Sequence, residues 1–256
     1  MRILFLGNSN EWLTLAHGTS LRHEIVEREL SKEFGPVELV RKPAWPTAEF
    51  PGVVEKWIGE YSPDLVYINV AEYWCLYESI PLRIERAMPR FGKRVSRAGQ
   101  TAAATPWVSH NRVFRGLRQT AQSVIAGAVY FTPDEVVERV LETTRRCLRN
   151  EGLVVVVDGQ RGRRPHATTR RWQERVEARR LEVHHRLKEE CARLHVVYGG
   201  DDVPQWKTHP EGMDGHRDGL HQGAAGQIWM AKESIELIRA AVEREDTWPK
   251  MLDAAR

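Results

Sequence analysis

The chain has few cysteines and no long apolar run. Its 256 residues include only Cys75, Cys147 and Cys191, too few and too scattered for a disulfide framework or a CxxC metal-binding motif. The first apolar run, residues 3–6, ends at Gly7 and is shorter than the apolar core of a secretory signal peptide. No segment approaches the roughly eighteen apolar residues of a membrane-spanning helix. These absences predict a cytoplasmic protein without a membrane span.

The chain also has little net charge. It contains 38 Lys and Arg against 35 Asp and Glu, a formal net charge of +3, which gives only weak grounds for a polyanionic partner. Arginines do gather between residues 161 and 180, but glutamates share the segment 174–190 at ion-pair spacing. We therefore expect a solvated helix face there and no nucleic-acid partner, with contact between residues 160–169 and an anionic substrate as the alternative.

What the chain does contain is an alternation of strand-length apolar runs with helix-period segments. The expected strands are residues 2–6, 37–40, 65–70, 154–157 and 195–198. The expected helices are residues 18–34, 52–61, 133–150, 168–194 and 223–243. This pattern is typical of a parallel sheet covered on both faces, and it predicts an α/β fold, a doubly wound three-layer α/β/α sandwich.

The organisation along the chain indicates one unit. There is no repeat, low-complexity stretch or linker, so we expect a single domain over residues 1–256 with an irregular helical insertion at about 71–132. The helix after this insertion should begin at Thr132-Pro133, a capping hydroxyl followed by proline in the first turn. The sequence carries no signal for an oligomeric state.

Two short segments carry polar groups suited to chemistry. The first is Gly7-Asn8-Ser9-Asn10, directly after the first expected strand. In doubly wound sheets ligands bind outside the carboxyl ends of the strands, so Ser9 is placed where a nucleophile would meet a substrate. Taken alone, the segment also reads as ordinary turn chemistry.

The second segment is Asp218-Gly219-Leu220-His221, just before the last expected helix. A serine nucleophile needs a base to take its proton, and the base needs a group that fixes its tautomer and stabilises its charge. His221 and Asp218 can supply these two functions. An isolated Asp-x-x-His is common by chance, so the conjunction of the two segments carries the interpretation.

Together these features resemble the SGNH (GDSL-like) serine hydrolases over essentially the whole chain, including a Pro-Asp pair, Pro63-Asp64, before the third strand. The resemblance implies a flavodoxin-like five-stranded sheet and a catalytic triad of Ser9, Asp218 and His221. It also implies cleavage of an ester, thioester or acetyl group of a small-molecule acyl substrate through an acyl-serine intermediate. Neither a cofactor nor a metal is implied.

The segments that would stabilise the oxyanion depart from the family pattern. The family uses the N–H of the nucleophile, the N–H of a glycine after the second strand, and an asparagine side chain after the third. Residues 42–47 contain no glycine, so a backbone N–H of Ala44 or Trp45 would have to serve, because Pro46 has none. Asn8 also stands where the family usually has Asp beside the serine.

The asparagine after the third strand is displaced as well. Tyr73 stands roughly where the family asparagine would be, and Asn69 lies four residues earlier. Asn69 is therefore either the replacement oxyanion donor or a cap on the end of the strand. His209, Asp214 and His216 precede the Asp-x-x-His pair, but their spacing matches no familiar metal-binding pattern.

Three functions remain open on this basis. The leading hypothesis is an esterase or acyl hydrolase. The altered oxyanion segments and the insertion also allow an acyltransferase or specialised biosynthetic enzyme, or a catalytically weak binding protein on the same scaffold.

Overall fold

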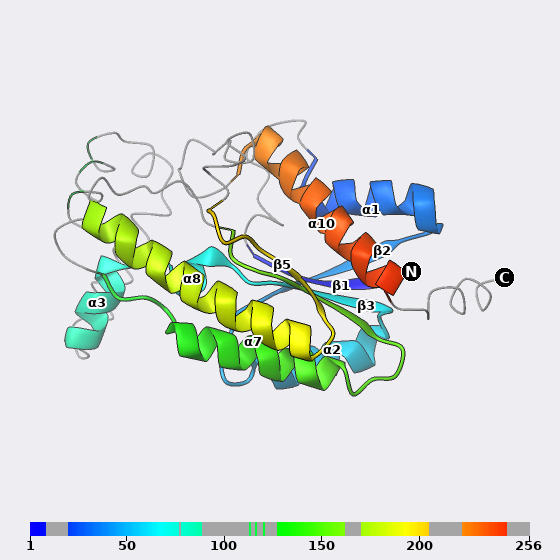
Figure 1. The fold of residues 1–256 in the computed structure, drawn as a ribbon, viewed down its shortest axis with the longest axis horizontal. Coiled ribbons are helices and arrows are strands. Elements are labelled where there is room, and N and C mark those ends of the chain that lie inside the picture. The colour runs from blue at the N-terminus through cyan, green and yellow to red at the C-terminus, as the bar shows by residue number, and fades with distance from the viewer. Residues whose placement is uncertain are drawn as a thin grey trace.

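The protein is described here from a computed structural model. The described residues are 1–8, 20–76, 78–88, 113, 116, 120, 127–161, 170–204 and 222–244. They contain a five-stranded, all-parallel sheet of order β2-β1-β3-β4-β5. The strand order reverses between β1 and β3, which is the switch point of a doubly wound sheet. The predicted α/β three-layer, flavodoxin-like fold is confirmed (Figure 1).

The strands lie close to their expected positions. Their bounds are β1 Arg2–Gly7, β2 Glu38–Pro43, β3 Leu65–Asn69, β4 Val154–Asp158 and β5 Val197–Gly199. The prediction for the last strand was wrong at its start, because His195 has a positive φ of 58° and turns the chain instead of extending it. The central strands β1, β3 and β4 are buried almost throughout, which explains their unbroken apolar sequences.

The helices cover both faces of the sheet, as Figure 1 shows. One layer holds α1 (Arg22–Phe34) and α10 (Ala224–Arg244), whose apolar side chains share a core with β1, β3 and β4. The opposite layer holds α2 (Phe50–Tyr61), α7 (Pro133–Cys147) and α8 (Arg170–Arg193), which share the second core. The short helices η2 (Glu72–Trp74) and α3 (Ile80–Ala87) lie within the expected insertion.

Local signals explain where helices begin and end. At the start of α7, Thr132 and Glu135 form a reciprocal capping box, with Pro133 in the first turn. This is the predicted start, and it satisfies backbone N–H groups that have no partner inside the helix. Helix α1 ends at Gly35, whose φ of 73° a side chain would disfavour. Helix α1 begins at Arg22, later than the expected residue 18.

The expectation of a solvated arginine face on α8 was wrong for several of its arginines. Arg180 is fully buried and donates to the carbonyls of Asp201 and Asp202 at 2.6 and 2.7 Å. Arg175 and Arg179 both donate to the buried carboxylate of Glu78. The acceptors lie far away in the sequence, so the local pattern of charges gave no sign of them.

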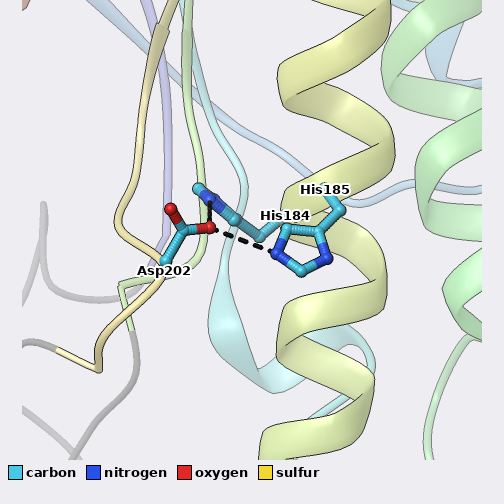
Figure 2. Close-up of side chains that lie close together, drawn as sticks. All are labelled: His184, His185 and Asp202. Carbon is cyan, nitrogen blue, oxygen red and sulfur yellow. Dashed lines mark hydrogen bonds and ion pairs between the residues drawn. The ribbon is translucent and has the colours of Figure 1, made fainter.

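The loop after β5 is held against α8 by side chains as well. His184 and His185 contact Asp202, each with its Nε2 atom 3.1 Å from Oδ1 of that carboxylate (Figure 2). Arg180 binds the backbone of the same loop. Helix α8 therefore fixes the first residues of the connection between β5 and α10.

Among the helices that the structure describes, none is both long enough and apolar enough to cross a membrane.

Candidate active site

The residues predicted to form the triad, Ser9, Asp218 and His221, lie outside the described residues. The structure does place the elements that flank them. Strand β1 ends at Gly7, just before Ser9, and α10 begins at Ala224, just after His221. Of the described residues, Gly7 lies at the carboxyl edge of the sheet, where such folds bind ligands.

The helices that follow these two segments contact each other. The backbone N–H of Arg22, at the start of α1, donates to Oε1 of Gln227 in the first turn of α10 at 2.9 Å. The Arg22 side chain also donates to Oγ of Ser234 on α10 at 2.7 Å. The chain leaving the Ser9 segment and the chain leaving the Asp218–His221 segment are thus joined by buried hydrogen bonds.

Asn69 is the last residue of β3 and lies at the same edge. The residue is only 5% exposed, and its Nδ2 atom has no hydrogen-bond partner within the described part of the chain. Such buried, unpartnered donors are uncommon and costly in native structures. Within the described residues the amide nitrogen caps no backbone carbonyl, and whether Asn69 is an oxyanion donor or a strand cap stays a prediction.

After β2, the backbone N–H groups of Ala44 and Trp45 were the two predicted oxyanion donors, and the structure leaves one of them open. The N–H of Ala44 is used, because it donates to the carbonyl of Gly7 at 2.9 Å. The N–H of Trp45 makes no hydrogen bond to any described residue, while its carbonyl accepts from Thr47 at 2.7 Å. Of the pair, Trp45 is therefore the donor that remains open.

An aromatic cluster surrounds the Trp45 side chain. Its indole stacks on Tyr73, with ring centroids 5.2 Å apart, and meets Tyr130 and Phe131 edge-on at 5.4 and 5.6 Å. Trp45 is 38% exposed, so the cluster offers part of its surface to solvent. Tyr73, counted as the position of the family asparagine, is instead a ring-packing residue in η2, and burial raises the pKa of its phenol.

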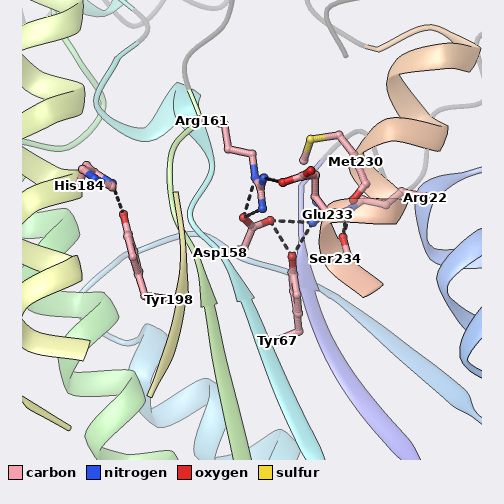
Figure 3. A network of polar contacts seen from close by, with 9 residues as sticks. All are labelled: Arg22, Tyr67, Asp158, Arg161, His184, Tyr198, Met230, Glu233 and Ser234. Atoms are coloured by element: carbon pink, nitrogen blue, oxygen red, sulfur yellow. Dashed lines mark hydrogen bonds and ion pairs between the residues drawn. The ribbon is translucent and has the colours of Figure 1, made fainter. Parts of the chain in front are cut away.

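Figure 3 shows a buried polar network around Asp158, which the sequence analysis missed. Asp158 is the register partner of Asn69 at the end of β4 and is fully buried. Its Oδ2 accepts from Arg22 Nη2 and from the Tyr67 hydroxyl, both at 2.7 Å. Its Oδ1 accepts from Nε and Nη2 of Arg161 at 2.9 and 2.7 Å, and Arg161 also pairs with Glu233.

The charges of this network are balanced. Burial alone would raise the pKa of Asp158, but the guanidinium groups of Arg161 and Arg22 outweigh that effect and hold the pKa below its usual value. Every oxygen of Asp158 is occupied, so the group is suited to holding β3, β4, α1 and α10 together, not to proton transfer. An acidic residue directly after four buried valines was the available sequence signal, because a buried carboxylate requires partners.

Comparisons with known proteins were made for sequence and for structure. Neither a protein-family model nor a curated protein matches the sequence. Among solved structures, TesA matches with a TM-score of 0.53 at 13% identity, over 94% of this chain and 99% of TesA. The esterase EstA from Pseudoalteromonas sp. matches with a TM-score of 0.52 at 10% identity, over 94% and 98% of the two chains.

The acetylxylan esterase Axe2 from Geobacillus stearothermophilus, solved as a catalytic mutant, is similar to the same degree. Its TM-score is 0.53 at 11% identity, and the match covers 93% of each chain. At such low identity the likeness establishes the fold. The chain therefore has the α/β fold of these three proteins, a three-layer fold as the sequence predicted.

Proposed function

We propose that this protein is a serine hydrolase that cleaves an ester, thioester or acetyl group of a small-molecule substrate. Ser9 is the nucleophile, His221 the general base and Asp218 the group that orients His221. The observation that carries the proposal is the buried, unpartnered amide of Asn69 at the switch-point edge of the sheet. A donor left open at that place is what a developing oxyanion requires.

The proposed reaction follows from these positions. Ser9 Oγ attacks the carbonyl carbon while His221 takes the hydroxyl proton, and the tetrahedral intermediate carries its negative charge on the former carbonyl oxygen. That oxygen accepts hydrogen bonds from the Ser9 and Trp45 backbone N–H groups and from Asn69 Nδ2. His221 then protonates the leaving group, and a water molecule, activated by the same histidine, releases the acyl group from Ser9.

Two further features support the proposal. The buried hydrogen bonds between α1 and α10 join the helices that follow Ser9 and the Asp218–His221 pair in the sequence. The partly exposed aromatic cluster around Trp45 provides an apolar surface beside the proposed Trp45 donor, suited to contact with part of the substrate.

Hydrolysis is favoured over acyl transfer because EstA and Axe2, which share the fold, are esterases. We also propose a cytoplasmic location, because all three cysteines are free and buried, which is in keeping with a reducing compartment.

The proposal is tested by replacing the nucleophile. Ser9→Ala should abolish hydrolysis of short p-nitrophenyl esters and labelling by an active-site phosphonate, since the attacking oxygen is lost. Ser20→Ala is the matched control, and we expect it to retain both activities. A Ser9→Ala variant that hydrolyses esters or takes up phosphonate like the wild type would refute the assignment.

A further inference from the structure

Outside the proposed active site, three metal-ligating side chains converge between α8 and the loop after β5. His184 and His185 project from consecutive positions of α8, and Asp202 faces them from the loop (Figure 2). One ligand atom from each residue lies within 4.8 Å of the other two. The Nε2 atom of each imidazole is 3.1 Å from the same carboxylate oxygen, Oδ1 of Asp202.

These separations suit a tetrahedral ion. Zinc binds imidazole nitrogen and carboxylate oxygen at about 2.0–2.2 Å, so two ligands of a tetrahedral zinc lie roughly 3.3 Å apart. The two measured separations of 3.1 Å are close to that edge. Two imidazoles and one carboxylate form a donor set that suits zinc and leaves the fourth position for water.

The outer groups of a metal site are also in place. Nδ1 of His184 contacts the Tyr198 hydroxyl at 3.1 Å, which fixes the ring with Nε2 toward Asp202. Lys188 donates to Oδ2 of Asp202 at 3.2 Å and so leaves Oδ1 to the imidazoles. Ligands of bound metals are commonly oriented by such second hydrogen bonds.

The backbone leaves room for this arrangement. A Cβ atom at Gly159 would lie 2.2 Å from the Tyr198 hydroxyl oxygen, and one at Gly200 would lie 3.0 Å from both that oxygen and His184 Nδ1. Gly200 also has a φ of 148°, which side chains disfavour. Glycine at both positions lets Tyr198 and His184 approach each other.

We propose that Nε2 of His184, Nε2 of His185 and Oδ1 of Asp202 bind a divalent transition metal, with Zn²⁺ as the preferred ion. The site is separate from the proposed active site. Strand β5 is three positions from β1 in the sheet, which at about 4.8 Å per strand is roughly 14 Å. The ion fastens the start of the β5–α10 connection to α8.

This proposal is independent of the esterase assignment, and zinc binding itself is the measurement that tests it. Metal-free full-length protein is titrated with ZnCl₂ by calorimetry. We expect one zinc per chain in the wild type and an affinity at least about tenfold weaker in His185→Gln and in Asp202→Asn, since each removes a ligand or its charge. His195→Asn is the control, an exposed histidine outside the cluster, and should bind zinc like the wild type.

A spectroscopic measurement complements the titration. Co²⁺ in place of zinc should give the visible absorption of tetrahedral coordination in the wild type and lose it in His185→Gln, whose side chain is 59% exposed and whose replacement leaves the core intact. Absence of stoichiometric zinc binding in the wild type, or wild-type affinity in both ligand variants, would overturn the proposal.

Discussion

The polar side chains at two neighbouring strand ends differ in their hydrogen bonding. Asn69 and Asp158 are paired in register at the ends of β3 and β4. Asp158 is saturated by two arginines and a tyrosine, whereas the amide nitrogen of Asn69 has no partner among the described groups. The difference separates a group that supports the structure from a group that we propose meets a ligand, and both are buried.

The contrast also explains how an open donor can stay in place. An unpartnered buried amide would relax toward any available acceptor if its surroundings were loose. Here the adjacent network ties four elements together through charge-assisted hydrogen bonds, which are shorter and stronger than neutral ones. The network around Asp158 thus holds the neighbouring end of β3, with Asn69, in place.

The largest effect is expected at the saturated strand end. Asp158→Asn should lower the free energy of unfolding by about 3–5 kcal/mol, because it removes the fully buried carboxylate that pairs with both Arg22 and Arg161. Urea denaturation measures this loss. The control is Glu38→Gln, which breaks the exposed pair with Arg2 and should cost less than about 1 kcal/mol. Equal losses in the two variants would show that the buried Asp158 contributes no more to stability than the exposed pair.

The open strand end should respond in activity and not in stability. Asn69→Ala should lower kcat by about 100- to 1000-fold, as for loss of one oxyanion donor. The unfolding free energy should change little, because the Nδ2 atom that is removed has no hydrogen-bond partner among the described residues. Steady-state kinetics on p-nitrophenyl esters and urea denaturation of the same variant provide the two readouts. Unchanged kcat with a marked loss of stability would make Asn69 a structural residue.

Helix α1 carries a buried titratable group, His23, whose pKa predicts a pH dependence of stability. Burial of His23, together with the charge of Arg41, lowers its pKa from 6.5 to about 4. The unfolded chain therefore takes up this proton near pH 6.5 and the folded chain only near pH 4, so stability falls as the pH decreases through that window, by up to about 3 kcal/mol. Unfolding free energies of wild type and His23→Gln between pH 7.5 and 4.5 measure it. Parallel curves for the two proteins would contradict the assignment.

The smallest effect is expected at Trp45. Trp45→Ala keeps the backbone N–H but removes the indole, so it should raise KM by about tenfold with little change in kcat, because ring contact is lost from both ground and transition states. Steady-state kinetics separate the two constants. Val53→Ala, a replacement at a similarly exposed apolar side chain, is the control and should alter neither. A fall in kcat with unchanged KM would show that the side chain acts in the transition state.

The sequence predicted the fold well because its main signal is local. Buried parallel strands such as Val154–Asp158 have nearly unbroken apolar sequences. The start of α7 is marked in the sequence by the capping residue Thr132 and by Pro133. Alternating strands and helices then allow few topologies, since crossovers between parallel strands are right-handed. Only the ends of elements, as at His195, depended on backbone conformations that the local pattern does not show.

The site was predictable to a lesser extent because its contacts are not local. Asn69 and Trp45 were named from the sequence, but only the structure shows which donors are occupied. The network around Asp158 was not predicted, because Arg22 and Glu233 come from opposite ends of the chain. Ser9, Asp218 and His221 rest on spacing and resemblance, and they stay predictions.

The hydrogen bond between Arg22 and Gln227 joins residues 205 positions apart, and this has a consequence for synthesis on the ribosome. When α1 emerges, the residues that bury its apolar face and receive its arginine have not yet been made. The apolar side chains of Ile25, Val26 and Leu30, which share a core with α10, stay accessible to other chains until that helix appears. Long-range closure of this kind slows folding and favours aggregation, so a nascent chain stalled before α10 is a natural client for a chaperone.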